Sequence, residues 1–132
     1  MEPMRLAVAT DDGEHFMGRH FGDAKFFEIY EFSGSGYEVV GRVINDLDEE
    51  GGHADPRKAK GIAGILREQD VQVAAAKVFG PNIKRIKKRF VCVLTGHDKI
   101  SDGLDMMVRR YPEIVAEFVK GDERGFLDWR DR

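Results

Sequence analysis

The chain has 132 residues, of which 42% are hydrophobic and 34% are charged, a composition typical of one soluble globular domain with its own core. The formal net charge is −3, so the sequence carries no strongly basic footprint for nucleic acid. A single cysteine excludes an intramolecular disulfide framework, and no apolar run approaches the roughly 20 residues that span a bilayer. With no signal-peptide pattern, we expect a cytoplasmic protein that binds neither nucleic acid nor membrane.

The first third of the chain predicts three strands joined as an antiparallel meander. Residues 5–10 form a short, largely apolar run, and a polar loop follows over residues 11–23. Residues 25–32 are rich in aromatic side chains, which favour strands. The turn signal Ser33-Gly34-Ser35-Gly36 predicts that the next run, residues 37–44, pairs with that strand as a hairpin.

The middle of the chain predicts an alternation of helices and strands. After an acidic, glycine-bearing loop over residues 46–55, Pro56 is suited to the first position of a helix that ends near Asp70. Apolar runs at residues 71–76 and 90–95 predict two buried strands, and Cys92 in the second is expected to be a small buried hydrophobe.

Three further segments complete the prediction. Gly80-Pro81-Asn82 ends a strand and starts a short helix through Arg89, whose basic residues we interpret as a solvated helix face. Ser101 or Asp102 is suited to cap a helix that runs to Arg110. Residues 112–120 have the spacing of one more amphipathic helix, and residues 121–132 form a charged tail that is either loose or docked through Phe126, Leu127 and Trp129.

This order of elements predicts an α/β fold. Strand–helix–strand crossovers imply parallel strands, to which the meander adds an antiparallel member. We expect a three-layer domain with a mixed five-stranded sheet in the order 3-2-1-4-5, which resembles the ribonuclease H-like fold. Residues 1–111 are expected to form this domain, and residues 112–132 a C-terminal extension that packs on it or trails from it.

The topology gathers the four histidines at one edge of the predicted sheet. His15 and His20 follow the first strand, His53 the third and His97 the fifth, and these strands leave the sheet in the same direction. Ligands of open α/β sheets favour this edge, and histidine is the commonest metal-ligating side chain. The alternative is that histidines simply favour polar surface loops.

Several ordered blocks carry a resemblance to a known family, and together they cover residues 4–110. They are Ala7–Gly13, His20-Phe21-Gly22 with the aromatic strand after it, Gly61-Ile62-Ala63, Val71-Gln72-Val73, Phe79–Asn82, Val91–Gly96 and Ile100–Leu104. This set resembles the dinitrogenase iron–molybdenum cofactor biosynthesis family of NifX, NafY and the NifB C-terminal domain. The chain departs from that pattern at Lys77-Val78-Phe79, where relatives often carry glycines, and in its tail.

The resemblance implies a non-enzymatic carrier of the iron–molybdenum cofactor or another iron–sulfur or molybdenum–sulfur cluster, which works with cluster donor or acceptor proteins. It implies His20 as the metal contact. Backbone amides near Phe21, Gly22 and Gly80 could bond to sulfides, because glycine allows close approach. Arg19 and Lys77 could offset negative charge. The full candidate binding site is Arg19, His20, Phe21, Gly22, His53, Lys77, Gly80 and His97.

Two other functions stay open. A cofactor-free interaction or scaffold domain could use the apolar residues of the tail as its contact. A metal-dependent nuclease would need several carboxylates around two metal ions, for which Asp11, Asp12, Glu28 and Glu31 are available. However, the two-residue period of a strand places Glu28 and Glu31 on opposite faces. The acidic run at residues 46–50 lacks the spacing of an EF-hand.

Overall fold

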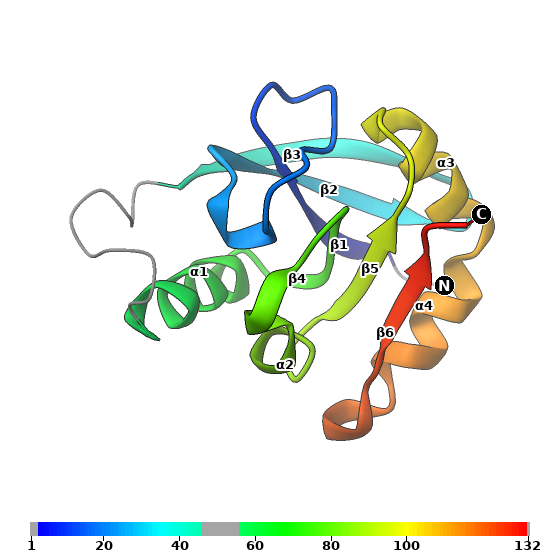
Figure 1. Cartoon of the computed structure of the whole chain (residues 1–132). Coiled ribbons are helices and arrows are strands. Elements are labelled where there is room, and N and C mark those ends of the chain that lie inside the picture. Colours follow the sequence, from blue (N-terminus) through cyan, green and yellow to red (C-terminus); the bar gives the residue numbers. More distant parts are fainter. Residues whose placement is uncertain (1–2, 46–55, 132) are drawn as a thin grey trace.

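The protein is a mixed six-stranded sheet between two layers of helices, seen in a computed structural model that describes residues 3–45 and 56–131 (Figure 1). The strand order is β3-β2-β1-β4-β5-β6. The strands are β1 (Met4–Thr10), β2 (Phe26–Ser33), β3 (Gly36–Ile44), β4 (Val71–Ala76), β5 (Val91–Thr95) and β6 (Phe126–Trp129). The α-helices are α1 (Pro56–Glu68), α2 (Ile83–Ile86), α3 (Ile100–Arg109) and α4 (Tyr111–Phe118), and short 3-10 turns lie at Phe21–Asp23, Gly80–Asn82 and Gly121–Glu123.

The predicted order of the first five strands is confirmed, and so is their direction. β2 is antiparallel to both β1 and β3, whereas β4 is parallel to β1 and β5 is parallel to β4. The chain therefore leaves β1, β3, β4 and β5 at the same edge of the sheet. This edge carries the loops in which we expected the binding site.

The described residues form six strands, one more than the five predicted from the sequence. Residues 126–129 form a sixth strand, β6, which pairs in parallel with β5. Trp129 is only 3% exposed and Leu127 packs against the same core, so neither side chain is available as the partner contact that the scaffold hypothesis assigned to them. Phe126 alone of the three stays exposed, at 46%. A four-residue strand inside a charged segment has too few apolar positions to show a period of two.

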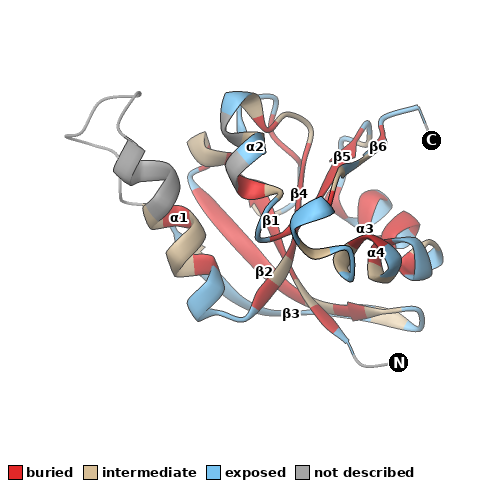
Figure 2. Ribbon diagram, turned by 90° about the horizontal axis from the view of Figure 1, so that it is seen from below, coloured by how far each residue is buried: buried red, intermediate tan, exposed pale blue. Residues whose placement is uncertain are grey.

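Alternating side chains divide the strands between two hydrophobic cores. On one face, Leu6 and Val8 of β1 pack with residues of α3 and α4. On the other face, Ala7 and Ala9 pack with residues of α1 and α2. The helices consequently cover both faces, and the buried residues in Figure 2 follow the strands and the inner sides of the helices. Cys92 is fully buried in the second core, and its burial raises the pKa of the thiol to about 12.

Two helix boundaries differ from the prediction. Lys99, and not Ser101 or Asp102, is the N-cap of α3, and its side chain makes no capping hydrogen bond. The backbone instead secures this end, because the Ile100 amide donates to the Glu14 carbonyl at 3.0 Å. The helix expected through Arg89 is shorter: α2 ends at Ile86, and a turn leads into β5.

The C-terminal segment is anchored by buried polar groups as well as by apolar ones. The Arg124 guanidinium is buried and donates to the carbonyl oxygens of Phe118 and Lys88. Glu117 is buried too, and its carboxylate accepts from the Gly125 amide at 2.8 Å and from Lys120 at 3.0 Å. These contacts fix the path of the chain from α4 to β6.

No α-helix in the described part of the chain is long and apolar enough to cross a bilayer. His53 and the acidic run at residues 46–50 lie outside the described residues.

Candidate cofactor-binding site

The loop after β1 is shaped by three polar side chains at its start. The Thr10 hydroxyl accepts from the Gly13 amide at 3.0 Å and donates to the His15 carbonyl at 2.6 Å. Asp12 accepts from the Glu14 and His15 amides, both at 2.8 Å, which is the turn that a short carboxylate side chain favours. Asp11 accepts from the Lys25 amide at 3.0 Å and so ties the start of the loop to its end.

His20 lies directly against the turn after β4. Its backbone forms a parallel bridge with Val78, and its imidazole covers Gly80. A Cβ atom placed on Gly80 would lie 2.6 Å from His20 Nδ1 and 2.7 Å from Cγ, closer than side chains can approach. Gly80 also has a φ of +76°, which favours glycine. Two sequence-predicted site residues from distant segments are therefore in contact, and His20 stays exposed.

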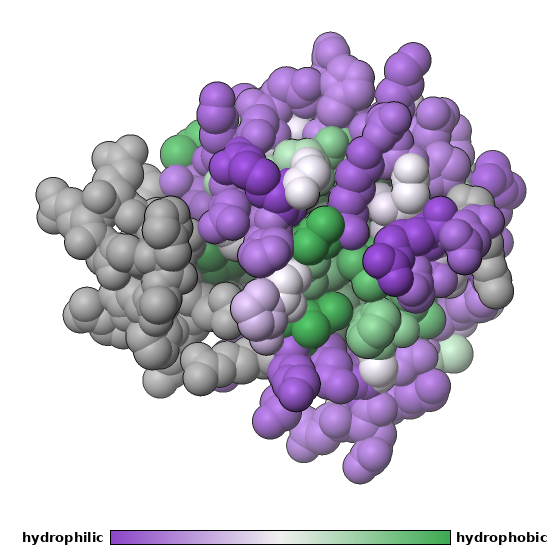
Figure 3. Space-filling view, viewed as in Figure 1, coloured by the Kyte–Doolittle hydropathy of each residue, from purple (hydrophilic) through white to green (hydrophobic). Residues whose placement is uncertain are grey.

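Phe21, the residue after His20, belongs to a buried cluster of aromatic rings with Phe27 and Phe79, here called the aromatic floor. Phe21 is fully buried and stacks on Phe79 with ring centroids 5.1 Å apart, and its other neighbour is Phe27 at 4.9 Å. The Phe21 amide donates to the Val78 carbonyl at 2.9 Å. The amide of Phe21 is thus already used and is not free for a sulfide, so Gly22 and Gly80 are the remaining candidate amides. A hydrophobic area also reaches the surface over β4 and β5 among hydrophilic side chains (Figure 3).

Both cations predicted for this site are held by carboxylates. Arg19 is paired with Asp11 at 2.5 Å, and Lys77 is paired with Asp98. Burial opposes ionisation of Asp11, but the Lys25 amide and the Arg19 guanidinium outweigh it and lower the pKa of that carboxyl group. The hydrogen bond and charge of Lys77 likewise lower the pKa of Asp98. An anionic ligand would have to compete with these carboxylates for the two cations.

His15 and His97 are the other histidines in the described part of the chain. His15 forms a backbone bridge with Lys99, and its Nδ1 lies 2.8 Å from an Asp12 carboxylate oxygen. The His97 amide donates to the Thr95 hydroxyl at 3.1 Å, and its Nε2 is buried with no hydrogen-bond partner. His15 and His97 both lie near the Asp98 carboxylate.

Asp98 and the turn-forming role of Asp12 were not among the features predicted from the sequence. The spacing of Asp12 and His15 is a usable signal, because an aspartate that caps a turn commonly bonds to residues two and three positions on. The pair of Lys77 and Asp98 joins segments 21 residues apart and gives no local signal.

The described part of the chain holds no group of three or more histidine, cysteine, aspartate or glutamate side chains that could hold a metal ion. The four carboxylates that a nuclease would use have other partners: Asp11 pairs with Arg19, Asp12 with His15, Glu28 with Arg42 and Glu31 with Arg5. The arrangement around His20 is able to offer a ligand one imidazole nitrogen, glycine amides and nearby cations. It is not a closed metal site.

Comparisons with known proteins agree with this fold. A crystal structure and a solution structure of a candidate dinitrogenase from Methanocaldococcus jannaschii are both similar. The crystal structure has a TM-score of 0.56 at 18% identity, covering 83% of this chain and 92% of that one. The solution structure has a TM-score of 0.57 at 19% identity, covering 84% and 92%.

No curated protein matches the chain. The family profile described as dinitrogenase iron-molybdenum cofactor, in contrast, matches residues 2–110. The ordered blocks around His20, Gly80 and β5 all lie inside that match, and the protein belongs to the dinitrogenase iron-molybdenum cofactor family.

Proposed function

We propose that this protein binds a metal–sulfur cluster, of the iron–molybdenum or a related type, as a non-enzymatic carrier between cytoplasmic assembly proteins. The family relates to the handling of the iron–molybdenum cofactor, which gives the class of cargo. The observation that carries the proposal is the contact of the exposed His20 imidazole with Gly80. His20 is the proposed metal ligand.

The fixed position of His20 supports this role. A ligand side chain binds more tightly when its surroundings hold it in one place, because less freedom is lost on binding. The backbone bridge of His20 to Val78 and the aromatic floor of Phe21 and Phe79 hold the start of the turn. Because residue 80 is a glycine, it has no side chain that would displace the His20 ring.

The charges nearby support an anionic cargo that is held reversibly. Arg19 and Lys77 lie in segments that flank the contact, and both already have carboxylate partners, Asp11 and Asp98. When a cluster binds, Arg19 and Lys77 would leave their carboxylate partners and pair with the cluster. When the cluster leaves, the two ion pairs would form again. Exposed ion pairs contribute roughly 0–1 kcal/mol each, so this exchange costs little in either direction.

The small number of ligands also fits a carrier. In structural metal sites, about four protein ligands complete the coordination of the metal, which stays bound as long as the protein is folded. One histidine, supplemented by the amides of Gly22 and Gly80, would leave most of a cluster open to a donor or an acceptor. His97 is a secondary candidate contact, and His53 remains a candidate from the sequence alone.

The experiment is anaerobic reconstitution with iron and sulfide, with and without molybdate, followed by visible absorption and metal analysis. The parent protein should take up cluster, and His20→Ala should lose most of it. His15→Ala is the matched control, because it removes a histidine from the same loop that has its own partner in Asp12. Equal uptake by the parent and His20→Ala would contradict the site.

Absence of uptake by the parent in this assay, and from a cluster preformed on a donor protein, would contradict the carrier function itself. In that case the cofactor-free scaffold would become the better hypothesis.

A further inference from the structure

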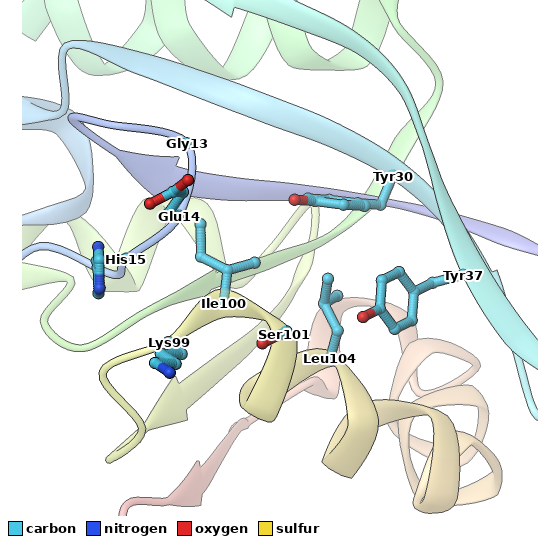
Figure 4. A pocket seen from close by; sticks show the side chains of 9 residues that line it. All are labelled: Gly13, Glu14, His15, Tyr30, Tyr37, Lys99, Ile100, Ser101 and Leu104. Atoms are coloured by element: carbon cyan, nitrogen blue, oxygen red, sulfur yellow. The ribbon is translucent and has the colours of Figure 1, made fainter.

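A second concave site lies on the other side of the loop after β1, away from His20. It is a cleft of about 350 Å³ between the hairpin of β2 and β3, the loop, and the first turn of α3. Figure 4 shows its walls: Tyr30 and Tyr37 from the hairpin, Glu14 and His15 from the loop, and Lys99, Ile100, Ser101 and Leu104 from the helix. Its size lies at the lower end of the range for small-molecule sites.

The walls of this cleft are fixed to one another. The loop is tied to α3 by the hydrogen bond from the Ile100 amide to the Glu14 carbonyl and by the bridge of His15 and Lys99. Tyr30 and Tyr37 meet edge to face with ring centroids 6.0 Å apart. Ile100 and Leu104 are buried and give the cleft an apolar floor. A ligand would therefore enter a site that already has its shape.

The Tyr30 side chain offers a hydrogen-bond donor at the cleft. Tyr30 is only 8% exposed, yet none of the described residues hydrogen-bonds to its hydroxyl, which points into the cleft toward Glu14 (Figure 4). Burial and the nearby Glu28 charge raise the pKa of Tyr30, so the hydroxyl remains a donor at neutral pH. The hydroxyl is therefore open at the cleft and able to donate a hydrogen bond to a ligand oxygen.

The rim adds a positive charge and open donors. Lys99 is exposed, has no carboxylate partner among the described residues, and does not cap the helix that it begins. The Ile100 amide is used by the Glu14 carbonyl, so the rim offers a ligand the Lys99 ammonium group and the Ser101 hydroxyl. Glu14 on the loop wall repels a second anionic group but can accept from a ligand hydroxyl.

We propose that this cleft binds a small hydroxy-carboxylate with an apolar body. Its carboxylate lies at Lys99 and Ser101, its body packs on Ile100 and Leu104, and its hydroxyl accepts from Tyr30 and donates to Glu14. The site shares no residue with the proposed cluster contact at His20 and Gly80, and its test is independent of cluster loading.

The test is a chemical-shift titration of the 15N-labelled protein with three probes of similar size. The probe 4-hydroxyphenylacetate carries both polar groups, phenylacetate lacks the hydroxyl, and 4-hydroxyphenylethanol replaces the carboxylate. We expect saturable shifts at residues 13–15 and 99–104, with 4-hydroxyphenylacetate binding at least about three-fold more tightly than the other two, as one hydrogen bond or one exposed ion pair allows.

Two variants assign the polar contacts. Tyr30→Phe should weaken 4-hydroxyphenylacetate about three- to ten-fold and leave phenylacetate unchanged. Lys99→Gln should remove the preference for 4-hydroxyphenylacetate over 4-hydroxyphenylethanol, whereas Lys88→Gln, in the turn between α2 and β5, should keep it. Equal binding of all three probes, shifts elsewhere on the protein, or no saturation would overturn the proposal. The probe series still decides the case should a variant fail to fold.

Discussion

The loop after β1 and the C-terminal segment from α4 to β6 hold their shapes in different ways. The loop is shaped by hydrogen bonds of Thr10, Asp11 and Asp12, and it leaves His15 and His20 exposed. The C-terminal segment buries large side chains such as Tyr111 and Trp129 in the core beneath α3. Removing the large buried side chains of the C-terminal segment should therefore alter stability, whereas changing the exposed histidines of the loop should alter binding.

Trp129→Ala should have the largest effect on stability. Removing a buried tryptophan costs about 3–5 kcal/mol, which is a large part of the roughly 5–15 kcal/mol that stabilises a domain. The guanidinium of Arg110 would also lose the ring that it covers at 4.4 Å. Urea unfolding measures the change, with Phe126→Ala on the same strand as the control, expected to cost less than about 1 kcal/mol. Equal costs would show that β6 is not anchored by its buried face.

Glu117→Gln should remove a pH-dependent part of stability. Burial opposes ionisation of Glu117, but the Gly125 amide and Lys120 outweigh it and keep its pKa below the ordinary 4.5. A lowered carboxyl pKa stabilises the folded state above pH 4.5, and this stabilisation is lost as pH falls through the folded pKa. We expect a loss of about 1–2 kcal/mol at pH 7 that vanishes in acid. A constant difference from pH 7 to pH 3 would contradict this.

Gly80→Ala should separate binding from stability. Alanine at this positive φ costs about 1–2 kcal/mol, and its Cβ would displace the His20 ring. Gly121→Ala is a matched control, because Gly121 also has a positive φ, +62°, but has no atom within 4 Å of its Cβ position. Both variants should lose similar stability in urea, and only Gly80→Ala should lose cluster uptake. Loss of uptake in both would assign the effect to general destabilisation.

Asp98→Asn should have the smallest effect of these variants, and it should strengthen cluster binding instead of weakening it. It removes the carboxylate that competes for Lys77, so an anionic cluster should bind about two- to five-fold more tightly. The gain should shrink as salt rises, because exposed charges are screened. Titration of apo protein with preformed cluster at two salt concentrations measures it, and weaker binding than in the parent would show that Asp98 supports the site.

Local patterns were sufficient to predict most of the sheet and the position of the candidate binding loop after β1. The aromatic run of β2, the turn at Ser33–Gly36 and the apolar runs of β4 and β5 each specify an element within a few residues. The strand directions then placed the loops after β1, β4 and β5 at one edge. Because the loop with His20 and the turn at Gly80 both lie at this edge, and β1 is next to β4, the two segments are in contact.

The remaining features depend on side chains that meet across long stretches of chain. β6 is specified by its packing, since Trp129 fills the core beside α3 and Arg124 reaches the Lys88 carbonyl. The pair of Lys77 and Asp98, and the cleft that brings Tyr30 to α3, depend on the assembled fold. His53 stays a prediction, outside the described residues.

Pulsed EPR of the loaded, reduced protein with 15N-labelled histidine shows directly whether His20 ligates the cluster. A histidine nitrogen bound to a paramagnetic cluster gives a hyperfine coupling that the label changes. We expect this coupling in the parent and in His15→Ala, and its loss in whatever cluster His20→Ala retains. A loaded parent without the coupling, or His20→Ala that keeps it, would rule out His20 as the ligand.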